Sequence, residues 1–568
     1  MLIVFSLQVN IERLPYGLFY TLNSDKKLMS LLETTFFLAI LIACLSLIQN
    51  SDYAVVIFLV LLESIFIIFF LLYFTYQRAL KLINPHEQLN MIIEKTSRSL
   101  KWWDKRFKRA EPIIKNSNED DTFDWKRSSF FILNPHYFYE VKNALNFIDS
   151  ITQRHLDTGD YIVSEMSFNT FISINSLYIK AKGKTFFSSS AFLDTGFGDD
   201  EVINKTLEYL RLNFAINLKK SDERALNQIL LCYVELAKVY TTIKYKIERD
   251  SKTHANLASQ YLIDDTEKLV QLRNPDLLMN GIRNIEGIAT FYIEHGLLTG
   301  TVTMIESVGR IGIVSALDKT QTPVVQIAMN AFSNITKNLV MSQNRISFVL
   351  EEVNKQINML VRTILQEPVK YGHDHSLGTY YGYNNNSLIQ YLTTLTNALL
   401  DQESIGKNEK KILDNILVYS DKSYKLNKEL FLLALEKQSL SVNNFLAWID
   451  HYSYLLLILS TLEYSKKMEL ERYARWYFSI ISFIPPKKEA IKYAEIFNLT
   501  ETIFDSGNKY IQQNLLPGVP TIIDLLINWS FKVGEYGESP YDFVLGLLGA
   551  SYLTLTCECE YESVNLTV

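Results

Sequence analysis

The sequence predicts a mainly α-helical protein in which a two-helix transmembrane hairpin precedes a large cytoplasmic helical domain that carries a small β element. Three observations support this fold class. Two long apolar runs lie near the start of the chain, apolar residues recur three and four positions apart through most of the remainder, and one stretch is rich in β-branched and aromatic residues. The first two patterns are typical of helices and the third is typical of strands.

The length and composition limit the class of protein. A chain of 568 residues is too long for one compact core, so we expect two or three structural units. A net charge of -6 gives no general attraction to phosphates, and we expect no nucleic-acid partner. Four cysteines are too few for a disulfide framework and suit a reducing compartment.

After an N-terminal segment, residues 1–27, two apolar runs cover Leu28–Ile48 and Ala54–Tyr76. Each run contains a single ionisable residue, Glu33 in the first and Glu63 in the second. Crossing a bilayer takes about 20 predominantly apolar residues, which both runs provide. The short connection between them requires antiparallel helices, so residues 28–76 are predicted to form a transmembrane hairpin. The alternative is a buried helical hairpin in a soluble core.

The orientation follows from the positions of basic residues. They flank only the outer ends of the two runs: Arg13, Lys26 and Lys27 before the first, and Arg78 and Lys81 after the second. Cytoplasmic flanks carry such an excess, so we expect a multi-pass protein of the inner or plasma membrane with both termini cytoplasmic. The first residues lack a basic region and a cleavage site, which favours an uncleaved anchor over a signal peptide.

Glu63 lies about 15 Å into its helix, close to the centre of a bilayer, where an ionised carboxylate is costly. One hypothesis makes it a proton or cation relay, or a gating charge, within several assembled hairpins. The other makes it a protonated group bonded to Ser64, to a backbone carbonyl or to a neighbouring hairpin. Both predict a homo-oligomer, because one pair of helices offers this carboxyl few partners.

Residues 77–117 combine apolar residues at helical spacing with a late basic cluster. The cluster and its aromatic neighbours are Trp102, Trp103, Lys105, Arg106, Lys108 and Arg109. Such a mixture is typical of a helix that contacts anionic membrane lipid at the interface. A basic helix packed on the next domain is an equally good interpretation. The acidic sequence that follows predicts a solvated linker over residues 118–136.

Residues 137–200 read as a mixed α/β element. The pattern is helical from Tyr137 to Gln153, and β-branched and aromatic residues with partial alternation then predict a few strands in Asp160–Phe192. The tripeptide that begins at Gly183 does not make a phosphate loop, because Tyr178 stands where a Walker motif needs glycine.

Residues 201–568 are predicted to be helical. The sequence at Met279, MNGIRNIEGIA, is echoed at Met329 by MNAFSNITKNL, and each follows a proline, Pro275 or Pro323. The spacing of about 50 residues is near the length of helical-hairpin repeats. This favours an α-solenoid of the HEAT or armadillo kind over a compact bundle. We expect the apolar run Val544–Thr556 to be a buried helix or a terminal packing element.

The stretch Lys370–Ser387 is the candidate closest to a chemical site. It contains Tyr371, His373, His375, Tyr380, Tyr381 and Tyr383. In an extended chain the two histidines point to one side, but a closed zinc site needs three or four ligands. A mixture of Tyr, Gly and Asn suits protein recognition, so we predict an interaction loop. Cys557 and Cys559 supply at most half a metal site, and we expect no metal or cofactor.

Three functions are consistent with these features. The preferred one is a membrane-tethered interaction or sensor module that oligomerises through its hairpin and binds an unknown cytoplasmic protein. The alternative is a membrane effector or channel, of the kind used in bacterial defence, in which Glu63 lines the assembled hairpins. An enzyme that uses His373 and His375 ranks last, and we predict no catalytic residue.

Overall fold

The computed structural model describes residues 26–46, 54–114, 124–186, 200–245, 252–382, 387–402, 404–536 and 539–566. Two compact units are present. Unit 1 comprises Met1–Glu248 with Thr253–Ala255, and unit 2 comprises Arg249–Lys252 with Asn256–Val568. The division falls after residue 245 of the described chain, whereas the sequence-based division placed a boundary at residue 200.

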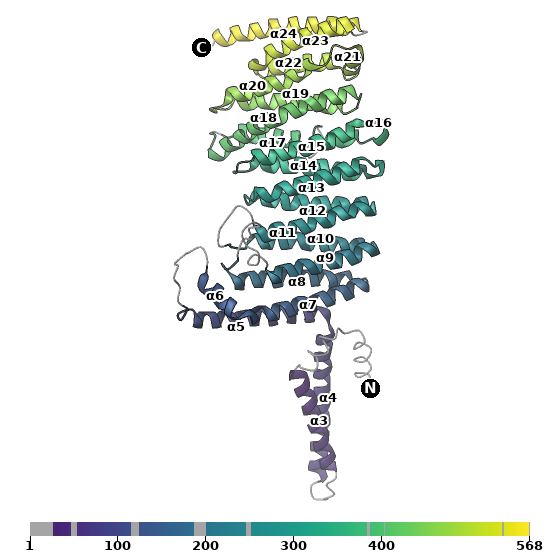
Figure 1. Cartoon of the computed structure of the whole chain (residues 1–568), viewed down its shortest axis with the longest axis vertical. Helices are drawn as coiled ribbons and strands as arrows, with labels where there is room; N and C mark the ends of the chain where they lie inside the picture. Colours follow the sequence, from purple (N-terminus) through teal and green to yellow (C-terminus); the bar gives the residue numbers. More distant parts are fainter. Residues whose placement is uncertain are drawn as a thin grey trace. The chain divides into compact units, whose positions relative to one another are not determined.

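Unit 1 is built from helices (Figure 1). They are α3 (Lys26–Ser46), α4 (Ala54–Ile83), α5 (Pro85–Ala110), α6 (Trp125–Leu133), η2 (Pro135–Phe138), α7 (Tyr139–Asp157), α8 (Tyr161–Lys182), α9 (Glu201–Lys220) and α10 (Glu223–Thr241). Helix α5 packs on α7 and α8, α7 packs on α9, and α8 packs on α10. Alternate helices therefore contact each other, as in stacked helical hairpins.

Helices α3 and α4 pack side by side along their length (Figure 1). The positions of lower exposure alternate at spacings of three and four, which is the pattern of a two-stranded coiled coil. On α3 they are Leu28, Leu31, Thr35, Leu38, Ile42 and Leu45, and on α4 they are Ile57, Leu61, Ser64, Ile68, Leu71 and Thr75. The remaining apolar side chains of the pair face away from it.

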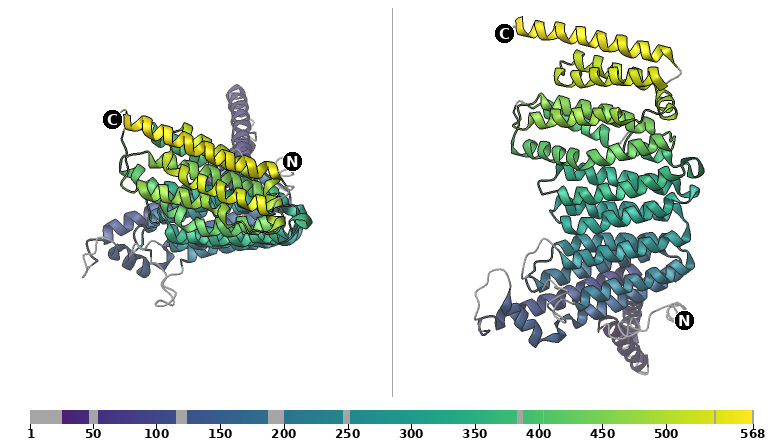
Figure 2. Two further views of the ribbon diagram at one scale, coloured as in Figure 1. Left: turned by 90° about the horizontal axis from the view of Figure 1, so that it is seen from above. Right: turned by 45° about the horizontal axis from the view of Figure 1, so that its top comes forward.

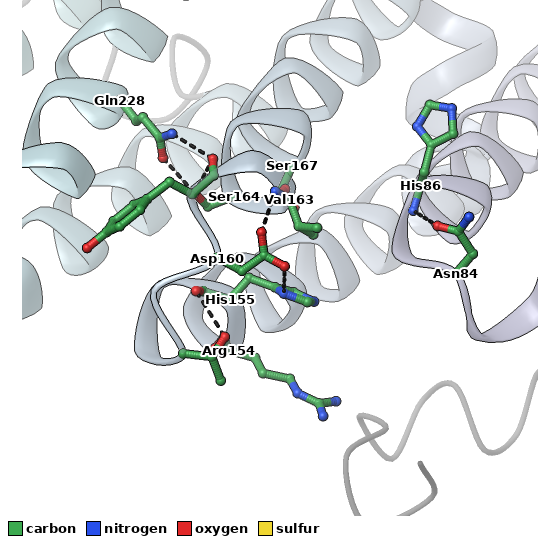
Figure 3. Close-up of polar contacts among 11 residues, drawn as sticks. Asn84, His86, Arg154, His155, Asp160, Val163, Ser164, Ser167 and Gln228 are labelled. Atoms are coloured by element: carbon green, nitrogen blue, oxygen red, sulfur yellow. Dashed lines mark hydrogen bonds and ion pairs between the residues drawn. The ribbon is translucent and has the colours of Figure 1, made fainter. Parts of the chain in front are cut away.

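The predicted strands at Asp160–Phe192 are wrong within the described residues, because Tyr161–Lys182 forms helix α8. The Asp160 side chain starts this helix by accepting a hydrogen bond from the Val163 backbone N–H at 3.3 Å (Figure 3). Buried residues then recur at helical spacing, including Phe168, Phe171 and Ile174. Packing of this face against α5, α7 and α10 overrides the strand propensity of the β-branched residues.

The only bridge between extended residues in the described chain joins Phe186 to Tyr245. Residues 187–192 of the predicted β element lie outside the described residues. The predicted linker also needs correction, since Trp125–Leu133 is helix α6, capped by the Asp124 side chain, which accepts from Arg127 N–H at 2.9 Å.

Unit 2 is likewise helical in its described residues (Figure 1). Its helices are α11 (Thr253–Lys268, whose first turn belongs to unit 1), η3 (Leu269–Leu272), α12 (Pro275–Glu294), α13 (Leu298–Ala316), η4 (Lys319–Gln321), α14 (Thr322–Met341), α15 (Ser347–Gln366), α16 (Pro368–Tyr371), η5 (Asp374–Thr379), α17 (Leu388–Leu400), α18 (Lys407–Glu436), α19 (Val442–Ser460), α20 (Lys467–Phe478), η6 (Ser479–Phe483), α21 (Lys488–Glu495), α22 (Leu499–Gln512), η7 (Leu516–Gly518), α23 (Val519–Tyr536) and α24 (Pro540–Leu566).

The sequence echo lies on two helices that contact each other. The first copy is in α12 and the second is in α14, and α12 packs on α14 while α13 packs on α15. Proline occupies the first turn of both helices, where its missing N–H breaks no helical hydrogen bond. Ile285 and Ile335, at the same offset in the two copies, are both fully buried. Unit 2 is therefore a stack of helical hairpins and not a compact bundle (Figure 2).

Close packing between neighbouring helix pairs depends on glycine in α13, and Gly312 is an example. A Cβ added to Gly312 would lie 3.1 Å from Ala328 Cβ and 3.1 Å from Leu360 Cδ2. Those atoms belong to α14 and α15, so Gly312 allows three helices to meet. By contrast, Gly287 in α12 has nothing within 4 Å of an added Cβ.

We predict that Gly312→Val destabilises the protein by about 2 kcal/mol, because added atoms overpack the contact between α13, α14 and α15. The matched control Gly287→Ala should stabilise it by about 0.5–1 kcal/mol, through improved helix propensity. The urea midpoint of the full-length protein, followed by circular dichroism, measures both changes. Equal midpoints for the two variants would contradict the close packing described for α13.

Candidate functional site

The outer surface of the α3–α4 pair is the most unusual surface of unit 1. By length and composition, Lys27–Leu45 and Val55–Arg78 could each cross a membrane, and only 6% of each stretch is buried. A core helix of a soluble protein is mostly buried, which these two are not. The bulky exposed side chains include Phe36, Phe37, Phe58, Phe66, Phe69 and Phe70. An apolar surface of this extent requires cover by lipid or by protein.

Three threonine side chains of the pair have hydrogen-bond partners in their own helix. The hydroxyls of Thr34, Thr35 and Thr75 donate to backbone carbonyls four residues earlier, at 2.6, 2.8 and 2.8 Å. This arrangement satisfies the hydroxyl without water. It removes the penalty that an unpaired hydroxyl has in an apolar environment.

Glu63 and Ser64 lie on different sides of α4. Ser64 is 7% exposed and faces α3, whereas Glu63 is exposed on the outer face. Adjacent helical residues project about 100° apart, so this separation follows from the helix itself. No hydrogen bond or ion pair joins Glu63 to another residue of the described chain. The option of a bond to Ser64 is therefore not the arrangement observed, and the carboxyl faces outward.

Helix α5 has two faces of different character. Its buried residues, including Leu89, Leu100 and Phe107, pack against the rest of unit 1. A basic helix packed on its neighbours, one of the two interpretations of this segment, is thus observed. Trp103 belongs partly to that inner side, since its ring centroid lies 6.2 Å from that of Phe130.

The opposite face of α5 is basic and aromatic. Trp102 is 49% exposed, and the Arg106 guanidinium lies 3.9 Å from the centroid of its ring. The other exposed cations in the last three turns of this helix are Lys101, Lys105, Lys108 and Arg109. Lys108 pairs with Asp104 at 2.9 Å. Such a face could contact anionic lipid, while the inner face holds the helix on α7 and α8.

The stretch Lys370–Ser387 is not the exposed loop that its composition indicates. Tyr380 and Tyr381 are 1% and 0% exposed, and His373 is fully buried. The prediction that these side chains lie on a partner is therefore wrong. His375 is exposed, Tyr371 ends helix α16, and Tyr383 lies outside the described residues. The two imidazoles also differ in environment, because residues 374–379 form the 3-10 helix η5 and not an extended strand.

Residues distant in sequence explain this burial. Asp374 is almost buried and accepts hydrogen bonds from the hydroxyls of Ser439 and Ser441, the latter at 3.0 Å. Tyr381 contacts Trp448, with ring centroids 5.7 Å apart. The Tyr380 hydroxyl is 3.2 Å from that of Tyr419. The segment is thus held to α18, α19 and the turn between them, as part of the core of unit 2.

Other candidate ligands do not form a metal site. No group of three or more His, Cys, Asp or Glu side chains is placed to hold an ion in the described chain. At the turn between α7 and α8, His155 Nδ1 lies 3.4 Å from Asp160, but this is a single contact that flanks a helix cap (Figure 3). Cys557 is buried, burial raises the pKa of its thiol, and the Cys559 side chain lies outside the described residues.

Sequence reasoning missed a buried polar cluster in unit 1, which we call the Asp200 cluster: Tyr137, Tyr178, Lys182, Asp200, Tyr245 and His254. The Lys182 ammonium pairs with Asp200, and the Tyr178 hydroxyl donates to the same carboxylate at 2.9 Å. Asp200 also caps α9 by accepting from the N–H groups of Val202 and Ile203, both at 3.1 Å.

The cluster extends through two further contacts. The Tyr137 hydroxyl lies 3.3 Å from that of Tyr178, and the Tyr245 hydroxyl lies 2.8 Å from His254 Nδ1. Phe186, which forms the bridge with Tyr245, contacts the His254 ring with centroids 5.7 Å apart. The cluster therefore ties together η2, the end of α8, the start of α9, the segment after α10 and the start of α11. Only the helix-cap pattern at Asp200 is visible in the sequence.

The charge state of Asp200 follows from its surroundings. Burial by itself would raise the pKa of this carboxyl. The Lys182 ammonium and the Ile203 N–H stabilise the carboxylate, and the pKa of Asp200 lies below its usual value. With its buried ion pair and its internal hydrogen bonds, the cluster is best interpreted as a structural link between these segments.

Comparisons with known proteins give no family assignment. No protein family model matches this chain, and no curated protein matches it. A solved structure described as a circular tandem repeat protein with novel repeat topology and enhanced subunit contact surfaces is similar at 13% identity and a TM-score of 0.37. The match covers 84% of this chain and 99% of that one. A TM-score of this size does not establish a shared fold. The helix contacts described above define this chain as a helical-repeat protein.

We predict that Lys182→Met destabilises the protein at pH 7 by about 3 kcal/mol or more, because a buried carboxylate loses its partner. Because the folded-state pKa of Asp200 lies below the unfolded value of about 3.9, its carboxylate stabilises the folded protein above that pH. This stabilisation is lost as the pH falls through the folded pKa. The difference in the free energy of unfolding between wild type and variant should therefore narrow as the pH falls from 7 toward the folded pKa of Asp200, because the variant's carboxyl, buried without Lys182, takes up a proton at a higher pH than the wild-type carboxyl does. Urea midpoints measured from pH 7 to pH 3 test this, and a difference that does not change with pH would contradict it.

Proposed function

We propose that this protein is a membrane-anchored helical-repeat module. In this proposal α3 and α4 cross a bilayer as an antiparallel hairpin, and the helical stack of the remaining chain binds a partner protein on the cytoplasmic side. The observation that carries the proposal is the outward-facing apolar surface of α3 and α4, of which only 6% is buried. Stacked helical hairpins commonly present extended surfaces for protein binding, which supports the second half.

The proposed orientation places both ends of the chain in the cytoplasm. Support comes from Lys26 and Lys27 before the first apolar stretch and from Arg78 and Lys81 after the second. Helix α5 begins immediately after α4, because Asn84 accepts a hydrogen bond from His86 N–H at 3.0 Å and Pro85 sets the first turn (Figure 3). The basic and aromatic face of α5 would then lie near the membrane surface and contact anionic lipid.

The proposed partner surface is not the stretch Lys370–Ser387. Tyr380 and Tyr381 are core residues, so deleting this stretch would remove packing and would not simply detach a partner. We assign partner binding to the outer faces of the helical stack instead.

A second candidate function is a conducting or permeabilising assembly. The observation that favours it is the outward position of Glu63, in the apolar part of α4 and without a partner in the described chain. A carboxyl at this depth in lipid is costly unless it meets another hairpin. Several hairpins would satisfy it, either by a hydrogen bond that holds the oligomer or by lining a water-filled path.

The two candidates differ in the effect of Glu63 variants on oligomer mass and ion flux. If the carboxyl only holds hairpins together, Glu63→Leu should weaken association about 3- to 30-fold, since one interhelical hydrogen bond is worth about 0.6–2 kcal/mol. Glu63→Gln should then behave almost like wild type. The full-length protein in nanodiscs gives the mass, and the same preparation in liposomes gives the flux.

Phe70→Leu, on the exposed surface of the same helix, serves as the matched control because it keeps the apolar surface. Flux that is present in wild type and lost in both Glu63 variants would move the conclusion to the conducting assembly. Wild-type protein that is monomeric in nanodiscs over a range of protein-to-lipid ratios would exclude oligomerisation through Glu63 in either form.

A further inference from the structure

Helix α24 is the last helix of unit 2, and its two faces are both apolar. Its inner face packs on α22 and α23 through Gly546, Gly549, Ala550 and Leu553. The approach is close, since a Cβ added to Gly549 would lie 2.7 Å from a ring carbon of Phe504. The predicted terminal packing element is therefore present, but it accounts for only half of the helix surface.

The outer face of α24 carries a continuous apolar stripe, which we call the α24 stripe. Its residues and their exposed fractions are Tyr541 71%, Val544 49%, Leu548 65%, Tyr552 51% and Leu555 65%. Figure 2 shows α24, in yellow, with the other helices of unit 2 on one side of it. A contiguous exposed apolar stripe is typical of a contact surface, so this stripe calls for an occupant.

The spacing of the stripe identifies that occupant. Counted from Leu548, the stripe residues lie seven and four positions before it and four and seven positions after it. The pattern is thus symmetric about Leu548. An antiparallel copy of the same helix would bring Leu548 against Leu548, Val544 against Tyr552 and Tyr541 against Leu555. Each large ring would meet a smaller aliphatic side chain, which is the self-complementarity that a twofold interface needs.

Charge argues against one other occupant. Helix α24 contains no Lys or Arg, and its first turn carries Asp542. The lack of basic residues disfavours attachment of α24 to an anionic membrane surface.

We propose that α24 pairs with α24 of a second copy of this chain, antiparallel and about a twofold axis at Leu548. The stripe offers on the order of 500 Å² per copy, given that fully buried aromatic side chains contribute about 150–250 Å² each. Stable interfaces bury about 800 Å² per partner, so the contact is weak for chains free in solution. Two chains held in one membrane would pair more readily, because anchoring raises their effective concentration.

Cysteine cross-linking of the full-length protein in nanodiscs tests both the contact and its register. The background is the chain with Cys44, Cys557 and Cys559 replaced by Ser, which leaves only Cys232, in the core. With a short bis-maleimide, Leu548→Cys should yield a covalent dimer by itself. Tyr541→Cys should not cross-link to itself, but a mixture of Tyr541→Cys chains with Leu555→Cys chains should yield a dimer.

Two controls separate this contact from other associations. Leu548→Glu alters a side chain that is 65% exposed, so it should keep the helical content of the protein. The same substitution should abolish cross-linking of the Tyr541→Cys and Leu555→Cys mixture, because it places a charge at the twofold axis. Adding Glu63→Leu should leave the Leu548→Cys yield at least half of its original value, which distinguishes α24 pairing from hairpin association.

Three results would overturn the proposal. The first is self-cross-linking of Tyr541→Cys chains at the same yield as that of Leu548→Cys chains. The second is the absence of a cross-link at all stripe positions. The third is cross-linking that persists with Leu548→Glu. The first indicates a parallel pair, the second indicates that the stripe is covered by something other than a second copy, and the third indicates random collision.

Discussion

Each helix pair of this chain can bury its apolar face only against the next pair, and the rest of the structure depends on this constraint. In unit 2, α12 packs on α14 and α13 packs on α15, so these hairpins stack one upon the next. Glycine at Gly312 lets three helices meet, and proline at Pro275 begins a helix without loss of a hydrogen bond. Helix α24 packs on α22 and α23 with one face and carries an exposed apolar stripe on the other.

Much of this fold could be predicted from the sequence, because helical periodicity, proline positions and one repeated motif are local signals. The apolar stretches at α3 and α4 could likewise be predicted from the sequence. The β prediction for Asp160–Phe192 failed because β-branched residues indicate strands only when tertiary contacts do not favour a helix. Here the Asp160 cap and packing against α10 favour the helical conformation of α8. That packing involves residues about 60 positions away, which no local pattern contains.

The candidate sites show the same limit more strongly. The stretch around Tyr380 and Tyr381 has the composition of a recognition loop. Its contacts with Ser439, Ser441 and Trp448 nevertheless hold it in the core. Likewise, the Asp200 cluster joins residues from five separate segments, and only its helix cap has a sequence signature. Glu63 could be identified from its apolar context alone, because the cost of a carboxyl in lipid depends on depth and not on distant residues.

The central claim is that the outward apolar surface of α3 and α4 lies in a bilayer. The most direct measurement is flotation of the full-length protein with liposomes after an alkaline carbonate wash, beside a chain that lacks residues 26–83. The account predicts that the full-length protein stays with the lipid and that the shortened chain does not. Full-length protein that remains monodisperse in detergent-free buffer and leaves the lipid on washing would contradict the claim.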